Sequence, residues 1–143
     1  MRCQGPLFTR GMKKLLIRLD LREAPPDRQY DYWQAVSPSS YRVGRVPNGN
    51  GLGVNSDLWV LDDIVASHFS AGAHRIDAVA ATLGRSRAPF VKVRLYEAGR
   101  AEIQETFGPG HYLLGAGDVH FIDQSRSWSA RYEKHNQRTL IIP

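Results

Sequence analysis

The chain contains one cysteine, Cys3, among its 143 residues. A single thiol has no partner within the chain, so the sequence excludes an intrachain disulfide, and this cysteine usage favours a reducing compartment. No stretch approaches the roughly 18 consecutive apolar residues of a membrane helix. The most signal-like piece, residues 13–17, is interrupted by Arg18 after three apolar residues. We therefore expect a cytoplasmic protein that is neither exported nor inserted into a membrane.

Motifs of catalysis and metal binding are also missing. There is no His-x-His pair, no His-Glu-x-x-His, no cysteine cluster and no Gly-x-Ser-x-Gly elbow. The Gly-Asn-Gly of residues 49–51 is not followed by the Gly-Lys-Ser/Thr of a phosphate-binding loop. We expect no metal, no cofactor and no enzymatic activity, although scattered histidines still converge in some folds. The five histidines are His68, His74, His111, His120 and His135.

The positive charge is concentrated at the N-terminus. The chain has a formal charge of +5. Residues 1–23 hold six basic and two acidic side chains (6 − 2 = +4), whereas residues 24–143 contribute 13 − 12 = +1. A nearly neutral body does not suit the neutralisation of many phosphates, so we expect no direct DNA binding by this chain. We predict that residues 1–23 are a disordered lead-in or an extension, with the true start at Met1 or Met12.

The body of the sequence alternates apolar and polar residues in short segments separated by glycine turns. Such segments, closely spaced, indicate an all-β domain, here a small antiparallel β-barrel. Residues 98–100 predict a hairpin turn, residues 108–110 close the next strand, and residues 115–118 form a sharp corner that Asp118 braces. The expected strands are residues 64–69, 90–96, 101–107, 119–122, 128–132 and 139–142.

One short helix precedes the strands. Asp27 follows two prolines and is the predicted N-cap, and Tyr30, Trp33 and Val36 recur at helical spacing until residues 37–38 end the helix. We expect this aromatic face to pack on the barrel. The next residues are rich in glycine and asparagine and predict a loop or an irregular edge over residues 41–55.

The strand over residues 90–96 has two distinct faces. Its apolar residues fall on alternate positions, as expected of a half-buried strand, and they predict the core side. Arg94 is then expected on the exterior. On an interior face, its guanidinium would instead offer a carboxylate a bidentate partner. The apolar set is Val91, Val93 and Leu95, and the intervening residues are Lys92, Arg94 and Tyr96.

Several motifs together resemble the N-terminal sensing domain of the AraC family, the cupin-like half of those transcription regulators. The likeness covers residues 27–143, in motifs of modest specificity when taken singly. Later in the chain it rests on Ala98-Gly99-Arg100, Gly115-Ala116-Gly117-Asp118, Asp123-Gln124-Ser125-Arg126 and Leu140-Ile141-Ile142-Pro143. Earlier it rests on the aromatic helix of residues 27–33 and on residues 69–76.

This resemblance implies a mainly β fold, a cupin-like antiparallel β-barrel of the jelly-roll type with a short N-terminal helix. Residues 24–143 would form a sensing and dimerisation domain that binds a small-molecule effector and forms a homodimer. The family's helix-turn-helix domain would follow Pro143 and is absent from this chain. DNA would therefore be bound only through that missing domain.

A barrel of this size either is filled by side chains or leaves room for one small ligand. Core packing alone and a ligand cavity are about equally supported. A stand-alone cupin-like binding protein or enzyme, or an interaction module with a filled barrel, are the alternatives to a sensor. The candidate ligand-binding residues are Trp59, Tyr96, His120, Trp128 and Tyr132.

Overall fold

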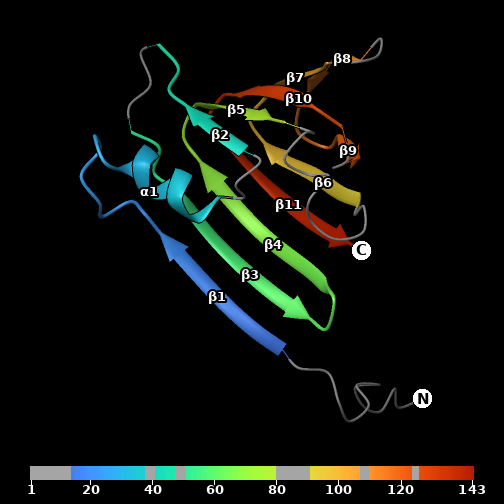
Figure 1. The fold of residues 1–143 in the computed structure, drawn as a ribbon, viewed down its shortest axis with the longest axis horizontal. Helices are drawn as coiled ribbons and strands as arrows, with labels where there is room; N and C mark the ends of the chain where they lie inside the picture. The colour runs from blue at the N-terminus through green and yellow to red at the C-terminus, as the bar shows by residue number, and fades with distance from the viewer. Residues whose placement is uncertain (1–13, 38–40, 48–50, 80–90, 107–109, 124–125) are drawn as a thin grey trace.

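The computed structural model describes residues 14–37, 41–47, 51–79, 91–106, 110–123 and 126–143. These residues form one short helix and a series of antiparallel strands (Figure 1). In chain order the elements are β1 (Lys14–Asp20), α1 (Gln29–Val36), β2 (Tyr41–Gly44), β3 (Asn55–Leu61), β4 (Ile64–Ala71), β5 (His74–Ala78), β6 (Val91–Ala98), β7 (Ala101–Glu105), β8 (His111–Leu114), β9 (Val119–Asp123), β10 (Trp128–Tyr132) and β11 (His135–Ile142).

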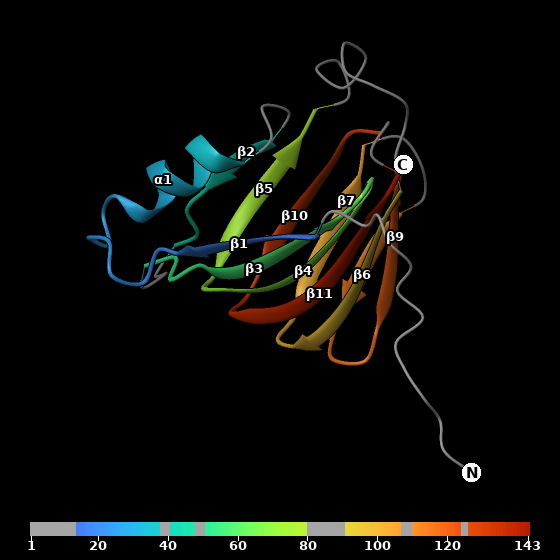
Figure 2. The same ribbon diagram turned by 90° about the horizontal axis from the view of Figure 1, so that it is seen from below.

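The strands form two sheets. The larger sheet has the order β1-β3-β4-β11-β6-β9, and the smaller sheet has the order β2-β5-β10-β7-β8. Figure 2 shows the two sheets facing one another, with α1 beside β2 at one end. The main core cluster combines Tyr96 and Ile122 of the larger sheet with Ile103, Trp128 and Tyr132 of the smaller one. The interior of the molecule is therefore the space between the two sheets, and the expected jelly-roll-type architecture is confirmed.

Most of the strands expected from alternation are present. The prediction for residues 128–132 matches β10 at both ends, and the predictions for residues 64–69 and 119–122 fall within β4 and β9. The last strand was placed too short, because β11 begins at His135 and pairs with both β4 and β6. Residues 90 and 107, the outer ends of two predicted strands, lie outside the described residues.

Two segments expected to lie outside the sheets are strands. Residues 14–20, part of the expected lead-in, form β1 and pair with β3 along their whole length. Residues 41–44, part of the expected loop, form β2 and pair with β5. In both cases the pairing partner lies far along the chain, so local composition gave no sign of it. Residues 1–13, which include both candidate start positions, lie outside the described residues.

The helix is shorter than predicted, and the prediction that Asp27 is its N-cap is wrong. Helix α1 begins at Gln29, and Arg28 occupies the N-cap position without a side-chain cap. Instead, the side-chain amide of Gln29 donates a hydrogen bond to the Ala24 carbonyl and accepts one from the Gly53 backbone N–H. These two bonds hold the first turn of the helix in place without a cap. The last helical residue is Val36, and Ser37 is the C-cap, so the helix ends where the sequence predicted.

The aromatic face of α1 packs on the fold, as the pattern indicated, but it is narrower than predicted. The Tyr30 hydroxyl donates to the Ala73 carbonyl at 3.0 Å, and the Trp33 ring lies 5.1 Å from that of Phe69. Val36 is 57% exposed and takes no part in this contact. The helix thus covers a second core cluster at one end of the sheets, separate from the main core.

The turn at Gly99 is not a hairpin. It joins β6 of the larger sheet to β7 of the smaller sheet, which do not pair with each other. Its φ of +82° suits glycine, and the corner packs closely against the backbone of Lys134 and His135. The turn after β8 follows the prediction, because the Asp118 carboxylate accepts a hydrogen bond from the Gly115 amide at 2.7 Å.

Candidate functional site

Strand β6 buries the face that alternation assigned to solvent. Lys92 is 8% exposed, Arg94 4% and Tyr96 0%, whereas Val91 is 45% exposed and Leu95 38%. The prediction of an exterior Arg94 and an interior set of valines and leucine is therefore wrong. These polar side chains point into the space between the sheets, which we call the interior face of the larger sheet.

The reason for this inversion lies on the neighbouring strands. In the ladder Arg94 pairs with Thr139 of β11 on one side and with His120 of β9 on the other, and Tyr96 pairs with Gln137. Gln137 and Thr139 are also buried, at 7% and 6% exposure. Three adjacent strands thus present polar groups to the interior together.

The Lys92 ammonium is buried beside an aromatic ring. Its Nζ donates to the Tyr41 hydroxyl at 2.8 Å and lies 5.0 Å from the centre of the Tyr41 ring. Burial, and then the nearby Arg94 charge, hold the pKa of Lys92 well below its ordinary value. The protonated form is therefore costly here unless a negative charge comes close.

Arg94 is held among aromatic rings at the centre of the interior. Its Nη1 donates to the Tyr132 hydroxyl. Its Cζ lies 5.4 Å from the centre of the Trp128 ring and 5.9 Å from that of Tyr132. Burial opposes its charge, but the Tyr132, Tyr96 and Tyr41 hydroxyls favour it, and the pKa of Arg94 is raised from its ordinary value. Arg94 is a permanent buried cation.

No carboxylate accompanies these cations. Among the residues that the structure describes, no Asp or Glu is buried. Several buried polar atoms around Arg94 also make no hydrogen bond within the described chain. They are Arg94 Nε, the Tyr96 hydroxyl, His120 Nδ1, Trp128 Nε1, Gln137 Oε1 and Thr139 Oγ1.

A cluster of imidazole and phenol rings adjoins Arg94. The Tyr132 ring contacts both His74 and His135, with ring centroids at 4.8 Å and 4.7 Å, and the two imidazole rings lie 5.5 Å apart, so the three rings form a triangle. Each histidine donates its Nδ1 proton to a backbone carbonyl, of Gly72 and Glu133 respectively, at 2.9 Å. Burial lowers the pKa of His74 to about 4 and that of His135 to about 3. Both rings are therefore neutral at physiological pH.

Four of the five predicted site residues lie together. Tyr96, Trp128 and Tyr132 are almost fully buried in the interior, and His120 is half-buried on the same face beside Arg94. Burial, and then the Arg94 charge, lower the pKa of His120 to about 4. Trp59 is not among them, because it lies on the outer face of the larger sheet.

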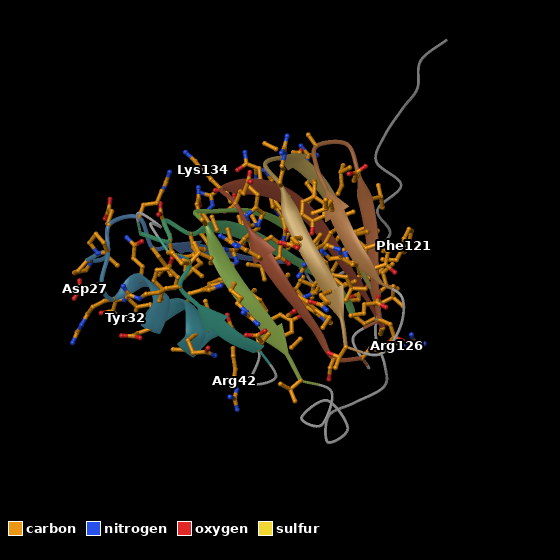
Figure 3. All side chains as sticks on the ribbon, turned by 90° about the horizontal axis from the view of Figure 1, so that it is seen from above. Asp27, Tyr32, Arg42, Phe121, Arg126 and Lys134 are labelled. Carbon is orange, nitrogen blue, oxygen red and sulfur yellow. The ribbon has the colours of Figure 1, made fainter. Side chains whose placement is uncertain are left out.

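That outer face is apolar over much of its area. A groove of about 550 Å³ runs over β3, β4, β11 and β6 and is lined by Trp59, Val93, Leu95 and Leu140, among others. On the edge strand β9, Phe121 is 67% exposed, and Figure 3 shows its side chain at the periphery of the molecule. Val93 and Leu95 are two of the residues that the alternation of β6 assigned to the core.

Sequence reasoning missed part of the interior cluster. Lys92 was assigned to solvent, and Tyr41 to a loop. His74 and His135 were noted only as scattered histidines. Their convergence depends on ladders such as Tyr132↔His74 of β10 and β5, which a single segment does not reveal.

Two further properties concern the whole described chain. Within the residues that the structure describes, no three or more His, Cys, Asp or Glu side chains gather closely enough to hold a metal ion. The described part of the chain also contains no helix that is long and apolar enough to cross a membrane.

No protein-family model matches the sequence, and no curated protein matches it. Solved structures do. The crystal structure of the AraC-like transcriptional activator CuxR superposes on 92% of this chain with a TM-score of 0.75 and 21% sequence identity. The chain spans 47% of that protein's length. The resemblance to the cupin-like part of AraC-type regulators is thereby confirmed at the level of the fold.

Two cupins are similar over less of the fold. A cupin superfamily protein from Desulfitobacterium hafniense has a TM-score of 0.46 and 16% identity, over 62% of this chain and 75% of its own. An RmlC-like cupin from Shewanella frigidimarina has a TM-score of 0.46 and 11% identity, over 74% of this chain and 86% of its own.

Proposed function

We propose that this chain is the effector-sensing and dimerisation half of an AraC-type transcription regulator, and that DNA is bound by a helix-turn-helix domain outside these residues. The observation that carries the proposal is the match to the AraC-like activator, which covers 92% of this chain but only 47% of the activator. The proposal includes a small-molecule effector, a homodimer, a cytoplasmic location and the absence of enzymatic activity.

The interior cluster supports the sensing part of this proposal. A domain that only filled a core would gain stability from apolar side chains there, yet Lys92, Arg94, Gln137 and Thr139 are buried instead. Polar atoms held in place without partners are typical of sites that bind a ligand. An effector bound there would act by favouring one of two arrangements of the regulator, and its effect would equal its difference in affinity for the two.

An antibody raised against this chain tests the proposal in the source cells. We expect an immunoblot band at about twice 16.1 kDa, since a DNA-binding domain of ordinary size would be joined to the chain. We also expect the antibody to co-precipitate a small set of DNA fragments after cross-linking. Antibody pre-adsorbed with the purified chain is the control.

A single band at 16.1 kDa without enriched DNA would contradict the proposal. It would favour a stand-alone cupin-like binding protein or enzyme. A longer band without enriched DNA would also count against a regulator.

A further inference from the structure

The interior contains positive charge that nothing in the described chain neutralises. Arg94 is 4% exposed and Lys92 is 8% exposed, two positions apart on β6, and no described Asp or Glu is buried with them. Burying a charge without a counter-charge is costly, and proteins normally pair such groups. Hydroxyl groups of tyrosines accept hydrogen bonds from both basic side chains but carry no negative charge at neutral pH.

Unsatisfied hydrogen-bonding groups surround the same guanidinium. Arg94 Nε and Trp128 Nε1 are donors without a partner among the described residues, and the equally unpartnered Thr139 Oγ1 lies on the residue that pairs with Arg94 in the ladder. His120, the other ladder partner, is half-buried, and its Nδ1 makes no hydrogen bond within the same part of the chain. Ordered water would satisfy hydrogen bonds at some of these atoms, but it would leave the charge of Arg94 unbalanced.

We propose that the interior between the two sheets binds a small organic carboxylate, whose charged group lies against Arg94 between β9 and β11. This inference rests on the proposed function only in calling that carboxylate the effector. A guanidinium matches a carboxylate in shape and charge, and the unused Nε offers it a hydrogen bond. Thr139 and Trp128 supply further donors to the same group.

The charge of the site favours a carboxylate over a phosphate ester. Arg94 stays protonated at all relevant pH values, whereas burial lowers the pKa of Lys92 and makes its protonated form costly. A monoanion therefore balances the charge of Arg94, whereas a phosphate monoester carries up to two negative charges. The aromatic rings of Trp128 and Tyr132, close to Arg94, suit an apolar or aromatic ligand body.

Benzoate is a suitable probe because it joins a carboxylate to an aromatic ring. Thermal unfolding and calorimetric titration of the 143-residue chain would compare benzoate with the neutral isostere benzamide and with phenyl phosphate, all at one ionic strength set with sodium chloride. We expect benzoate to bind and to raise the melting temperature. We expect benzamide to have no effect and phenyl phosphate to bind more weakly than benzoate.

Variants locate the binding. Arg94→Met is expected to weaken benzoate binding at least about tenfold, since a charged hydrogen bond of this kind is lost. Without benzoate, the same variant should melt at or above the wild-type temperature, because it removes an unbalanced buried charge. Arg131→Met, at an exposed position of β10, is the control and should bind benzoate within about twofold of the wild type.

Several results would overturn the carboxylate site. They are no binding of benzoate to the wild type, equal binding of benzamide, tighter binding of phenyl phosphate, or unchanged benzoate binding by Arg94→Met. If Arg94→Met does not fold, the carboxylate requirement is decided by the benzoate and benzamide titrations of the wild type. Thr139→Val then replaces it in locating the site, and it should weaken benzoate binding because it removes the unpartnered hydroxyl beside Arg94. The regulator proposal is tested separately by the immunoblot and the DNA co-precipitation. If benzoate does not bind, only the carboxylate site is contradicted. If benzoate binds but no DNA is enriched, only the regulator proposal is contradicted.

Discussion

Replacing Gly99 by alanine is expected to lower the free energy of unfolding by about 4 kcal/mol, from backbone strain and steric overlap together. Gly99 adopts φ +82°, a conformation that other residues rarely take. A Cβ atom there would lie 2.1 Å from the Lys134 carbonyl oxygen and 2.7 Å from the Cα of His135. These are backbone atoms, which cannot rotate away as a side chain can. Either the turn between β6 and β7 at Gly99 or the turn between β10 and β11 at Lys134 therefore has to move.

Gly117 provides a matched control for this substitution. Its φ is +91°, but an added Cβ would meet no atom within 4 Å. Gly117→Ala should therefore show the backbone strain alone, about 1 to 2 kcal/mol. Urea denaturation of both variants gives the comparison. Equal losses in the two variants would show that the corner at Gly99 relaxes freely, and would contradict the expectation.

Acidification is expected to destabilise the protein strongly between pH 6.5 and pH 4. In the unfolded chain histidines take up protons near pH 6.5, whereas burial lowers the pKa of His74 to about 4 and that of His135 to about 3. The unfolded state therefore binds more protons throughout this window, and the free energy of unfolding falls as the pH falls. Between pH 7.5 and pH 5 the expected loss is about 2 kcal/mol for each of these histidines.

A series of denaturation curves from pH 7.5 to pH 4.5 measures this dependence. His135→Phe keeps an aromatic ring beside Tyr132 and removes one of the three histidines whose pKa is lowered, the others being His74 and the half-buried His120. It should therefore reduce the dependence by between about a third and a half. His111→Gln changes an exposed histidine and should leave the dependence nearly unchanged. A dependence as steep in His135→Phe as in the wild type would show that other groups cause the acid destabilisation.

The strands were more predictable from sequence than the faces they bury. Alternation and flanking turns located β10 at both ends, because Trp128, Ala130 and Tyr132 are apolar, inward-facing and separated by polar residues. On β6 the same rule located the strand but inverted it. Alternation identifies which residues share a face, and the assumption that the apolar face is buried decides which face is inside.

The failure of that assumption is itself informative. The assumption that the apolar face is buried failed where β9, β6 and β11 lie side by side. Each of these strands directs a polar residue inward: His120 on β9, Arg94 on β6 and Thr139 on β11. Local rules are most often broken at functional sites, where stability is given up for binding. The ladders that create this polar face join residues far apart in the chain, so no single segment predicts it. The aromatic candidates Tyr96, Trp128 and Tyr132 were accessible from sequence. Arg94 was recognised as a possible partner for a carboxylate, but alternation did not place it in the interior.

The position of β11 also governs when the fold can form during synthesis. This strand pairs with β4 on one side and β6 on the other, and among the described strands no other joins those two in the larger sheet. Residues 135–142 leave the ribosome last among the described strands. The β1-β3-β4 part and the β6-β9 part of the larger sheet therefore cannot join until this segment has been translated. Such dependence on distant pairing slows folding and leaves strand edges open to chaperones in the meantime. A force-sensitive arrest peptide placed beyond Pro143 measures when the larger sheet forms, because folding pulls on the chain and releases the stalled ribosome. Release of the ribosome before β11 has emerged would contradict this expectation.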